Sequence, residues 1–160
     1  MKHIVAACLA LLLVTAPARA ESWVTYTDNV YGFEVDVPAD YRHDPLGDIQ
    51  RFISPDGRIE IAVLPGRLFR PLETMISEEI AKHTSRDWRI DDARTTPGWA
   101  SFTMRRSGFA QFSRAEQICP DSSFVRVDIG YGEAETARLL PIIEHVAESL
   151  RPTGTVTCSN

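Results

Sequence analysis

The fold of this chain is decided in residues 51–67, RFISPDGRIEIAVLPGR, where a polar corner separates two runs that alternate apolar and polar residues. Pro55 suits the second position of a type I turn, Asp56 the third and Gly57 the fourth. A phosphate-binding loop needs several glycines followed directly by a helix, and a calcium loop needs a series of alternate acidic residues. The sequence has neither pattern here, so the corner predicts the turn of a β-hairpin.

The apolar periodicity of the whole chain predicts an α+β fold, a single antiparallel β-sheet with two principal helices packed on it. Strands are expected at residues 23–27, 33–37, 49–53, 59–63, 88–94, 99–105, 109–118 and 124–131, and helices at residues 71–84 and 133–150. The short connections make neighbouring strands antiparallel. In the last strand the alternation predicts that Val125 and Val127 are buried and that Arg126 and Asp128 are exposed. Pro141 should either kink the second helix or mark the start of its last three turns.

The first twenty residues have the features of an export signal. A charged start precedes an apolar run at residues 4–14, and small residues at Ala18 and Ala20 fit a signal-peptidase site, so we expect a mature chain that begins at Glu21. A lipoprotein signal ending at Cys8 is the alternative, but it would leave almost no apolar segment before the cysteine. The run is shorter than the about 20 residues that span a bilayer. We therefore expect no transmembrane segment in the mature chain and a periplasmic or secreted location.

The charge and the length of the mature chain indicate which partners it is not expected to bind and how many domains it has. Cleavage leaves 15 of the 17 basic side chains against 22 acidic ones, a net charge near −7. Nucleic acids and anionic membrane surfaces attract basic proteins, so neither is an expected partner. After the cleaved signal peptide at residues 1–20, residues 21–160 have the length of a single globular domain.

Two cysteines remain after cleavage, Cys119 and Cys158. In an oxidising compartment such a pair favours a disulfide, which here would fix the C-terminal tail beside Cys119. Closing a loop of this length stabilises the folded state by about 4 kcal/mol in the chain-entropy model. A redox-active or metal-binding thiol pair is the alternative, although the spacing is not Cys-x-x-Cys.

Three segments of the chain resemble the PsbP-like superfamily, which includes an extrinsic protein of photosystem II and a nuclear Ran-binding relative. They are residues 31–38 (YGFEVDVP), residues 52–57 (FISPDG) leading into residues 59–61, and residues 149–152 (SLRP). The resemblance implies an exported bacterial protein with an α/β/α sandwich or a sheet with helices packed on it. Its motifs consist of turn and strand residues, so it implies no catalytic residue and no cofactor.

The loop at residues 38–48 contains a candidate metal site. His43, Asp44 and Asp48, with Asp40 nearby, are ligand types for zinc, manganese or calcium. A solvated acidic loop that binds no metal is the alternative.

Glu79 and His83 are four positions apart on the first predicted helix, a spacing that lets two side chains share a proton or a metal. His83 also lies about 20° from the apolar side of this helix at 3.6 residues per turn. A histidine at the edge of the core, hydrogen-bonded to Glu79, is therefore the simpler interpretation.

The chain has no sequence motif for nucleophilic catalysis. Gly-x-Ser-x-Gly and Ser-x-x-Lys are absent from the sequence, and a disulfide would remove the thiol nucleophile. We therefore expect a protein that is not an enzyme. A hydrolase whose residues meet only in the folded protein is the alternative.

Arg67, Leu68, Phe69 and Arg70 form a candidate partner-binding patch between the hairpin and the first helix. Aromatic and Arg side chains are enriched at protein interfaces. The alternative is that Leu68 and Phe69 simply cover the edge of the sheet. The favoured hypothesis is an exported, non-catalytic module that docks on another cell-envelope protein through a sheet face or this loop. A periplasmic protein that binds a small ligand or a metal is the alternative.

Overall fold

The computed structural model describes residues 22–120 and 122–158, and the predicted export signal lies outside them. The strands are β1 (Trp23–Asp28), β2 (Phe33–Pro38), β3 (Arg42–His43), β4 (Gln50–Ile53), β5 (Glu60–Arg67), β6 (Arg89–Thr95), β7 (Trp99–Arg106), β8 (Phe109–Cys119), β9 (Ser123–Gly132) and β10 (Arg151–Pro152). The helices are α1 (Leu72–Thr84), the 3-10 helix η1 (Glu133–Glu135) and α2 (Thr136–Ser149). All the expected strands and helices are present, with small shifts in their bounds.

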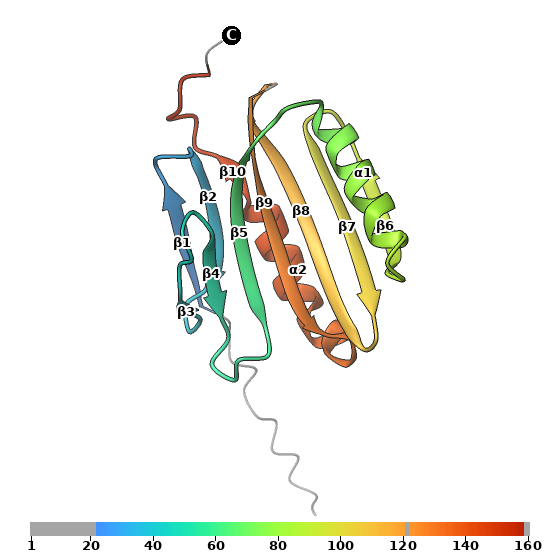
Figure 1. Cartoon of the computed structure of the whole chain (residues 1–160). Coiled ribbons are helices and arrows are strands. Elements are labelled where there is room, and N and C mark those ends of the chain that lie inside the picture. Colours follow the sequence, from blue (N-terminus) through green and yellow to red (C-terminus); the bar gives the residue numbers. More distant parts are fainter. Residues whose placement is uncertain (1–21, 121, 159–160) are drawn as a thin grey trace, which may run out of the picture.

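The strands form two sheets, which corrects the prediction of a single sheet. The small sheet has the order β1-β2-β10 and the large sheet the order β3-β4-β5-β9-β8-β7-β6 (Figure 1). Neighbouring strands in both sheets are antiparallel, as predicted. The predicted loop at residues 38–48 contains β3, which pairs with β4 and takes the place beside it. Strand β2 pairs instead with β10, a two-residue strand that follows the last helix.

The corner at Ser54–Gly57 is the predicted hairpin turn between β4 and β5. The amide of Gly57 donates to the carbonyl of Ser54 (2.9 Å), and Gly57 has a φ of +70°, a conformation that glycine adopts without strain. The Ser54 hydroxyl donates to Asp56 (2.7 Å) and accepts from the amide of Ile59 (3.0 Å). The Ser54 hydrogen bond is the largest cause of the lowered pKa of Asp56. The carboxylate is thus used to hold the turn.

The large sheet separates two apolar cores, because its residues alternate between its faces. On one face, Phe102 of β7 packs in a cluster with Leu72 of α1. On the other face, Val127 of β9 packs with Val146 of α2 and Phe33 of the small sheet. Figure 1 shows α1 and α2 on opposite sides of the large sheet. The arrangement is therefore three-layered, in agreement with the expected sandwich of helices and sheet.

Pro141 lies inside α2, which begins at Thr136. Of the two alternatives predicted for Pro141, the one in which it marks the start of the last turns is therefore wrong. A proline lacks the amide that would bond the carbonyl four residues earlier, at Ala137. Burial of Leu139 and Ile142 on either side of the proline holds the helix against the large sheet and offsets this loss.

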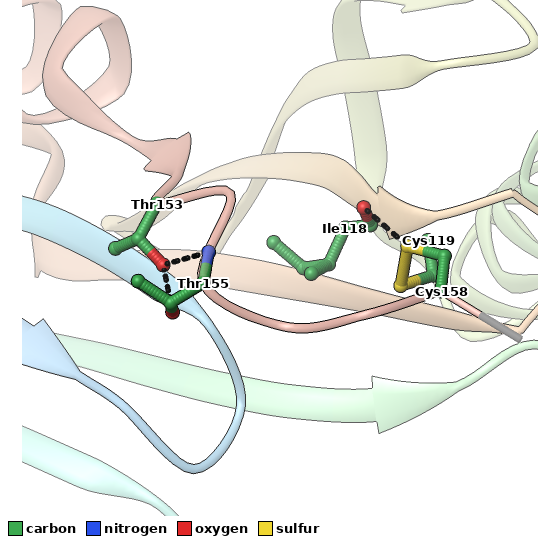
Figure 2. Close-up of a disulfide and its surroundings, with 5 residues drawn as sticks. All are labelled: Ile118, Cys119, Thr153, Thr155 and Cys158. Carbon is green, nitrogen blue, oxygen red and sulfur yellow. Dashed lines mark hydrogen bonds between the residues drawn. A yellow bond between two sulfur atoms is a disulfide. The ribbon is translucent and has the colours of Figure 1, made fainter.

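The C-terminal tail returns to β8, as predicted, and ends in the predicted disulfide. The sulfur atoms of Cys119 and Cys158 are 2.03 Å apart, and their Cα atoms 5.4 Å apart (Figure 2). Nearer the helix, the amide of Thr153 donates to the carbonyl of Gly32 (2.9 Å), and the hydroxyls of Thr153 and Thr155 lie 2.6 Å apart. The tail therefore ties the small sheet to the end of β8.

Candidate functional site

The predicted metal ligands of the 38–48 loop are each engaged with another protein group. The Nε2 atom of His43 lies 3.0 Å from Oε1 of Gln50. Asp44 accepts a hydrogen bond from Arg51 (2.7 Å), and burial together with the neighbouring Asp48 raises the pKa of the Tyr31 hydroxyl. Within residues 22–120 and 122–158, no group of three or more His, Cys, Asp or Glu side chains could hold a metal ion. A metal bound here would have to displace Arg51 from Asp44.

A charged cluster between α1 and the large sheet lies where solvent-exposed side chains were predicted. Arg126 donates to both oxygens of Glu79 (2.8 and 2.7 Å) and lies 3.0 Å from Asp128, which accepts from Ser113 (2.7 Å). Only 19% of the Arg126 side chain and 15% of the Asp128 side chain are exposed, since Glu79 of α1 lies on Arg126 and Asp128 lies between Arg126 and Ser113. The prediction that these two residues face solvent is therefore wrong. Burial raises the pKa of Asp128, and the charge of Arg126 opposes that rise.

His83 stands at the edge of the core, as its position on the helix indicated. Its Nε2 atom is 3.7 Å from Oε1 of Glu79, and its ring meets Trp88 edge-on with the ring centres 5.9 Å apart. The Glu79 oxygens are closer to Arg126 than to His83. Glu79 therefore acts as the ion-pair partner of Arg126 and fixes α1 on the sheet.

A histidine and a carboxylate also meet between β2 and α2. The Nε2 atom of His145 lies 3.1 Å from Oδ2 of Asp36, and the imidazole stacks on Trp23 with 3.9 Å between ring centres. The Thr25 hydroxyl donates to Asp36 (2.6 Å), and the Ser149 hydroxyl donates to a helix carbonyl (2.9 Å). Both hydroxyl protons are thus held by acceptors other than His145. In this geometry His145 is not the base of a serine or threonine nucleophile.

The fold buries one residue of the candidate partner-binding patch and leaves the other three exposed. Leu68 is buried in the core under α1, whereas Phe69 is 85% exposed. Arg67 and Arg70 are also exposed, and Arg70 pairs with Glu78 through two hydrogen bonds of 2.7 Å. The patch thus presents one aromatic ring and two arginines to solvent, and Leu68 anchors the loop beneath them.

Phe69 stands at the end of a groove that runs along α1. The groove has a volume of about 400 Å³ and is lined by Phe69, Arg70, Met75, Glu78, Glu79, Lys82, His83 and Arg86. We call these residues the Phe69 surface. The acids on it already pair with Arg70 and Arg126, whereas Lys82 and Arg86 form no ion pair within the described part of the chain. The Phe69 surface therefore carries unpaired positive charge on an acidic protein.

A second hollow of about 410 Å³ lies beside the hairpin turn. It is lined by Ser22, Pro38, Asp40, Tyr41, Ser54, Pro55, Asp56, Ile59, Arg138 and Ile142. Arg138 pairs with Glu135 at 2.6 Å. The pKa of Asp56, whose carboxylate holds the turn, is lowered chiefly by the Ser54 hydrogen bond and also by the charge of Arg138, so Asp40 is the lining carboxylate that forms no ion pair within residues 22–120 and 122–158. The hollow combines an apolar floor with negative charge. The sequence did not indicate it, because its walls come from four separate segments.

None of the helices in the described part of the chain is long and apolar enough to cross a membrane. No protein-family model matches the chain, and no curated protein matches it either.

Solved structures do resemble it. Cyanobacterial PsbP (CyanoP) from Synechocystis has 11% sequence identity and a TM-score of 0.61, over 86% of this chain and 96% of that one. The Ran-binding protein Mog1p of Saccharomyces cerevisiae has 8% identity and a TM-score of 0.63, over 85% of this chain and 98% of that one. LpqN of Mycobacterium tuberculosis, involved in cell envelope biogenesis, has 13% identity and a TM-score of 0.51, over 85% of this chain and 88% of that one. The resemblance found in the sequence is thereby confirmed at the level of the fold: this chain has the PsbP-like fold.

Proposed function

We propose that this protein is an exported, non-catalytic module that docks on another cell-envelope protein through the Phe69 surface. The observation that carries the proposal is the 85% exposure of Phe69 beside unpaired positive charge. An aromatic ring left in water favours burial against a partner by about 2 kcal/mol, and arginine and aromatic side chains dominate the energetics of many interfaces. The partner surface should therefore be apolar at its centre and acidic at its rim.

Export and the absence of catalysis rest on separate observations. The disulfide between Cys119 and Cys158 is typical of proteins that fold in an oxidising compartment. The hydroxyls of Thr25 and Ser149 donate to acceptors other than His145, which argues against hydrolysis at that point. Two proteins of the same fold are described as Ran-binding and as involved in envelope biogenesis, which supports a binding role for this chain.

The test compares the affinity of purified variants for the partner captured from the native envelope. Phe69→Ala should raise the Kd by about 30-fold, the equivalent of about 2 kcal/mol, without lowering the melting temperature. Val30→Ala is the matched control, because Val30 is 81% exposed and lies in the turn between β1 and β2, away from the Phe69 surface. Equal effects of the two variants on Kd, or a loss of folding in Phe69→Ala, would count against the proposal.

The hollow beside the hairpin turn favours small-ligand binding as a second candidate function. Its apolar floor and the rim carboxylate of Asp40 suit an organic ammonium ion. Phenethylamine should raise the melting temperature, benzyl alcohol should not, and Asp40→Asn should reduce the rise. The metal hypothesis for His43, Asp44 and Asp48 remains a prediction. The same assay with Ca²⁺, Mn²⁺ and Zn²⁺ tests it, and no stabilisation by any of them would remove it.

A further inference from the structure

Strand β1 is a sheet edge without the features that usually prevent edge strands from pairing. At the other edges, β3 and β10 have two residues each, and β10 contains Pro152. Strand β6 has an irregular register between Asp91 and Arg94, and Asp92 has a φ of +50°. Strand β1 is six residues long and pairs with β2 in unbroken register. It contains no proline, no basic residue and no bulge, which are the devices that protect edges.

The backbone groups that face outward from β1 can be identified from β2. Residues opposite each other in antiparallel strands exchange two hydrogen bonds or none. The amide of Asp36 donates to the hydroxyl of Ser149, away from β1, so Asp36 and its partner Thr25 exchange none. The amide and carbonyl of Thr25 therefore point to the free edge. By alternation, those of Trp23 and Thr27 do the same.

The side chains of β1 complement each other when a second copy is placed by a two-fold axis at Thr25. In that register Thr25 lies opposite Thr25 of the second copy, and Trp23 lies opposite Thr27 of the second copy. Val24, 52% exposed in one chain, then lies opposite Tyr26 of the second copy, on one face of the joined sheet. Aromatic and β-branched residues are a favourable cross-strand pair. The same register opposes no two like charges.

We propose that β1 is a dimerisation edge, through which two copies of this chain join their small sheets into one sheet of order β10-β2-β1-β1-β2-β10. A two-fold pairing consumes both free edges at once, so it closes the assembly at a dimer. The proposal goes beyond the docking function, since Phe69 does not belong to this edge. Phe69→Ala should leave the dimer unchanged.

The first test is sedimentation equilibrium of the mature chain from micromolar to about 500 µM, with two variants of Thr27. Thr27→Pro removes the outward amide without removing a hydrogen bond to β2, and proline is tolerated at edges in this position. It should weaken the dimer by at least about 10-fold, because it deletes two of the six hydrogen bonds between the copies. Thr27→Val keeps the amide and should dimerise as the wild-type chain does.

A wild-type chain that stays monomeric at 500 µM overturns the proposal, and so does a Thr27→Pro variant that dimerises as well as Thr27→Val. Circular dichroism and the melting temperature report whether Thr27→Pro still folds. If it does not, Val24→Lys decides instead, because it places a charge opposite Tyr26 of the second copy and leaves the β1 backbone intact. Undiminished dimerisation of Val24→Lys then overturns the proposal.

The register has its own test by cross-linking under mild oxidation. In the proposed dimer the two copies of Thr25 are a hydrogen-bonded pair with Cα atoms about 5.5 Å apart, a separation that a disulfide spans. Thr25→Cys should therefore form a cross-linked dimer. Thr27→Cys should not, because the two copies of residue 27 are offset along the strands by about 13 Å. Equal cross-linking of the two variants, or none with Thr25→Cys, contradicts the proposed register.

Discussion

Removal of the disulfide should cost this protein a large share of its stability. The clean perturbation is Cys158→Ser, because Cys158 lies at the exposed end of the tail, whereas Cys119 is buried and its thiol would keep filling its place in the core. Substitution of Cys119 instead would leave a buried hydroxyl or a cavity, which would lower the stability for a reason other than the loss of the disulfide. Cys158→Ser changes only the covalent connection and one exposed atom.

The size of the effect follows from the length of the closed loop. The two cysteines are separated by 39 positions. In the chain-entropy model, closing this loop lowers the conformational entropy of the unfolded chain by about 13 cal/mol/K. This corresponds to about 4 kcal/mol of folding stability at 25 °C. For a chain of this size, a loss of about 4 kcal/mol lowers the melting temperature by about 12–16 °C.

The assay is thermal and urea unfolding of the mature protein, followed by circular dichroism. The wild-type chain in reductant should unfold together with Cys158→Ser, and reductant should have no effect on Cys158→Ser. A variant that melts within about 3 °C of the oxidised wild-type chain would contradict this expected loss of stability. In that case the connection between the tail and β8 does not limit the unfolded state.

Two further pairs of variants test the tail and the buried charges. Gly32→Ala should lower the free energy of unfolding in urea by about 1–3 kcal/mol, because Gly32 has a φ of +73° and an added Cβ would overlap Val156 of the tail. Gly47→Ala is the control and should lower it less, because Gly47 also has a positive φ (+60°) but has open space around it. The pKa of Asp36 is lowered, and the hydrogen bond from Thr25 is the largest cause. The stability advantage of the wild-type chain over Asp36→Asn should therefore be complete at pH values above the ordinary pKa of 3.8 and should disappear as the pH falls through the lowered pKa. Burial raises the pKa of Asp128, so the wild-type chain should gain stability relative to Asp128→Asn as the pH falls through the raised pKa towards 3.8. A stability difference between the two chains that does not change with pH would contradict this assignment.

The alternation of apolar residues and the chemistry of the turns were sufficient to locate the strands and helices. Ile61 and Val63 alternate with polar residues, and Gly57 takes the positive φ that the turn requires, so this hairpin could be derived from local rules. Alternation shows which residues are buried but not which strand lies beside which. The separation of β1 and β2 from the large sheet depends on β3 and β10, which are too short to leave a periodic pattern.

The candidate sites were harder to predict, because side chains close in sequence do not point the same way. His43, Asp44 and Asp48 turn to three different partners, which no spacing rule reveals. Leu68 and Phe69 are neighbours, yet one is buried and the other is exposed. An exposed aromatic ring can be recognised only after the helix that covers its neighbour has been placed.

Docking through the Phe69 surface can be observed by site-specific photo-cross-linking in the source cell. A benzophenone amino acid replaces Phe69 in one strain and Val30 in another. Position 69 should cross-link to one envelope protein, whereas position 30 should not. Added wild-type mature protein should suppress the product, whereas added Phe69→Ala should not. Cross-linking of the same protein from position 30 alone, or equal competition by the wild-type chain and Phe69→Ala, would contradict docking through the Phe69 surface.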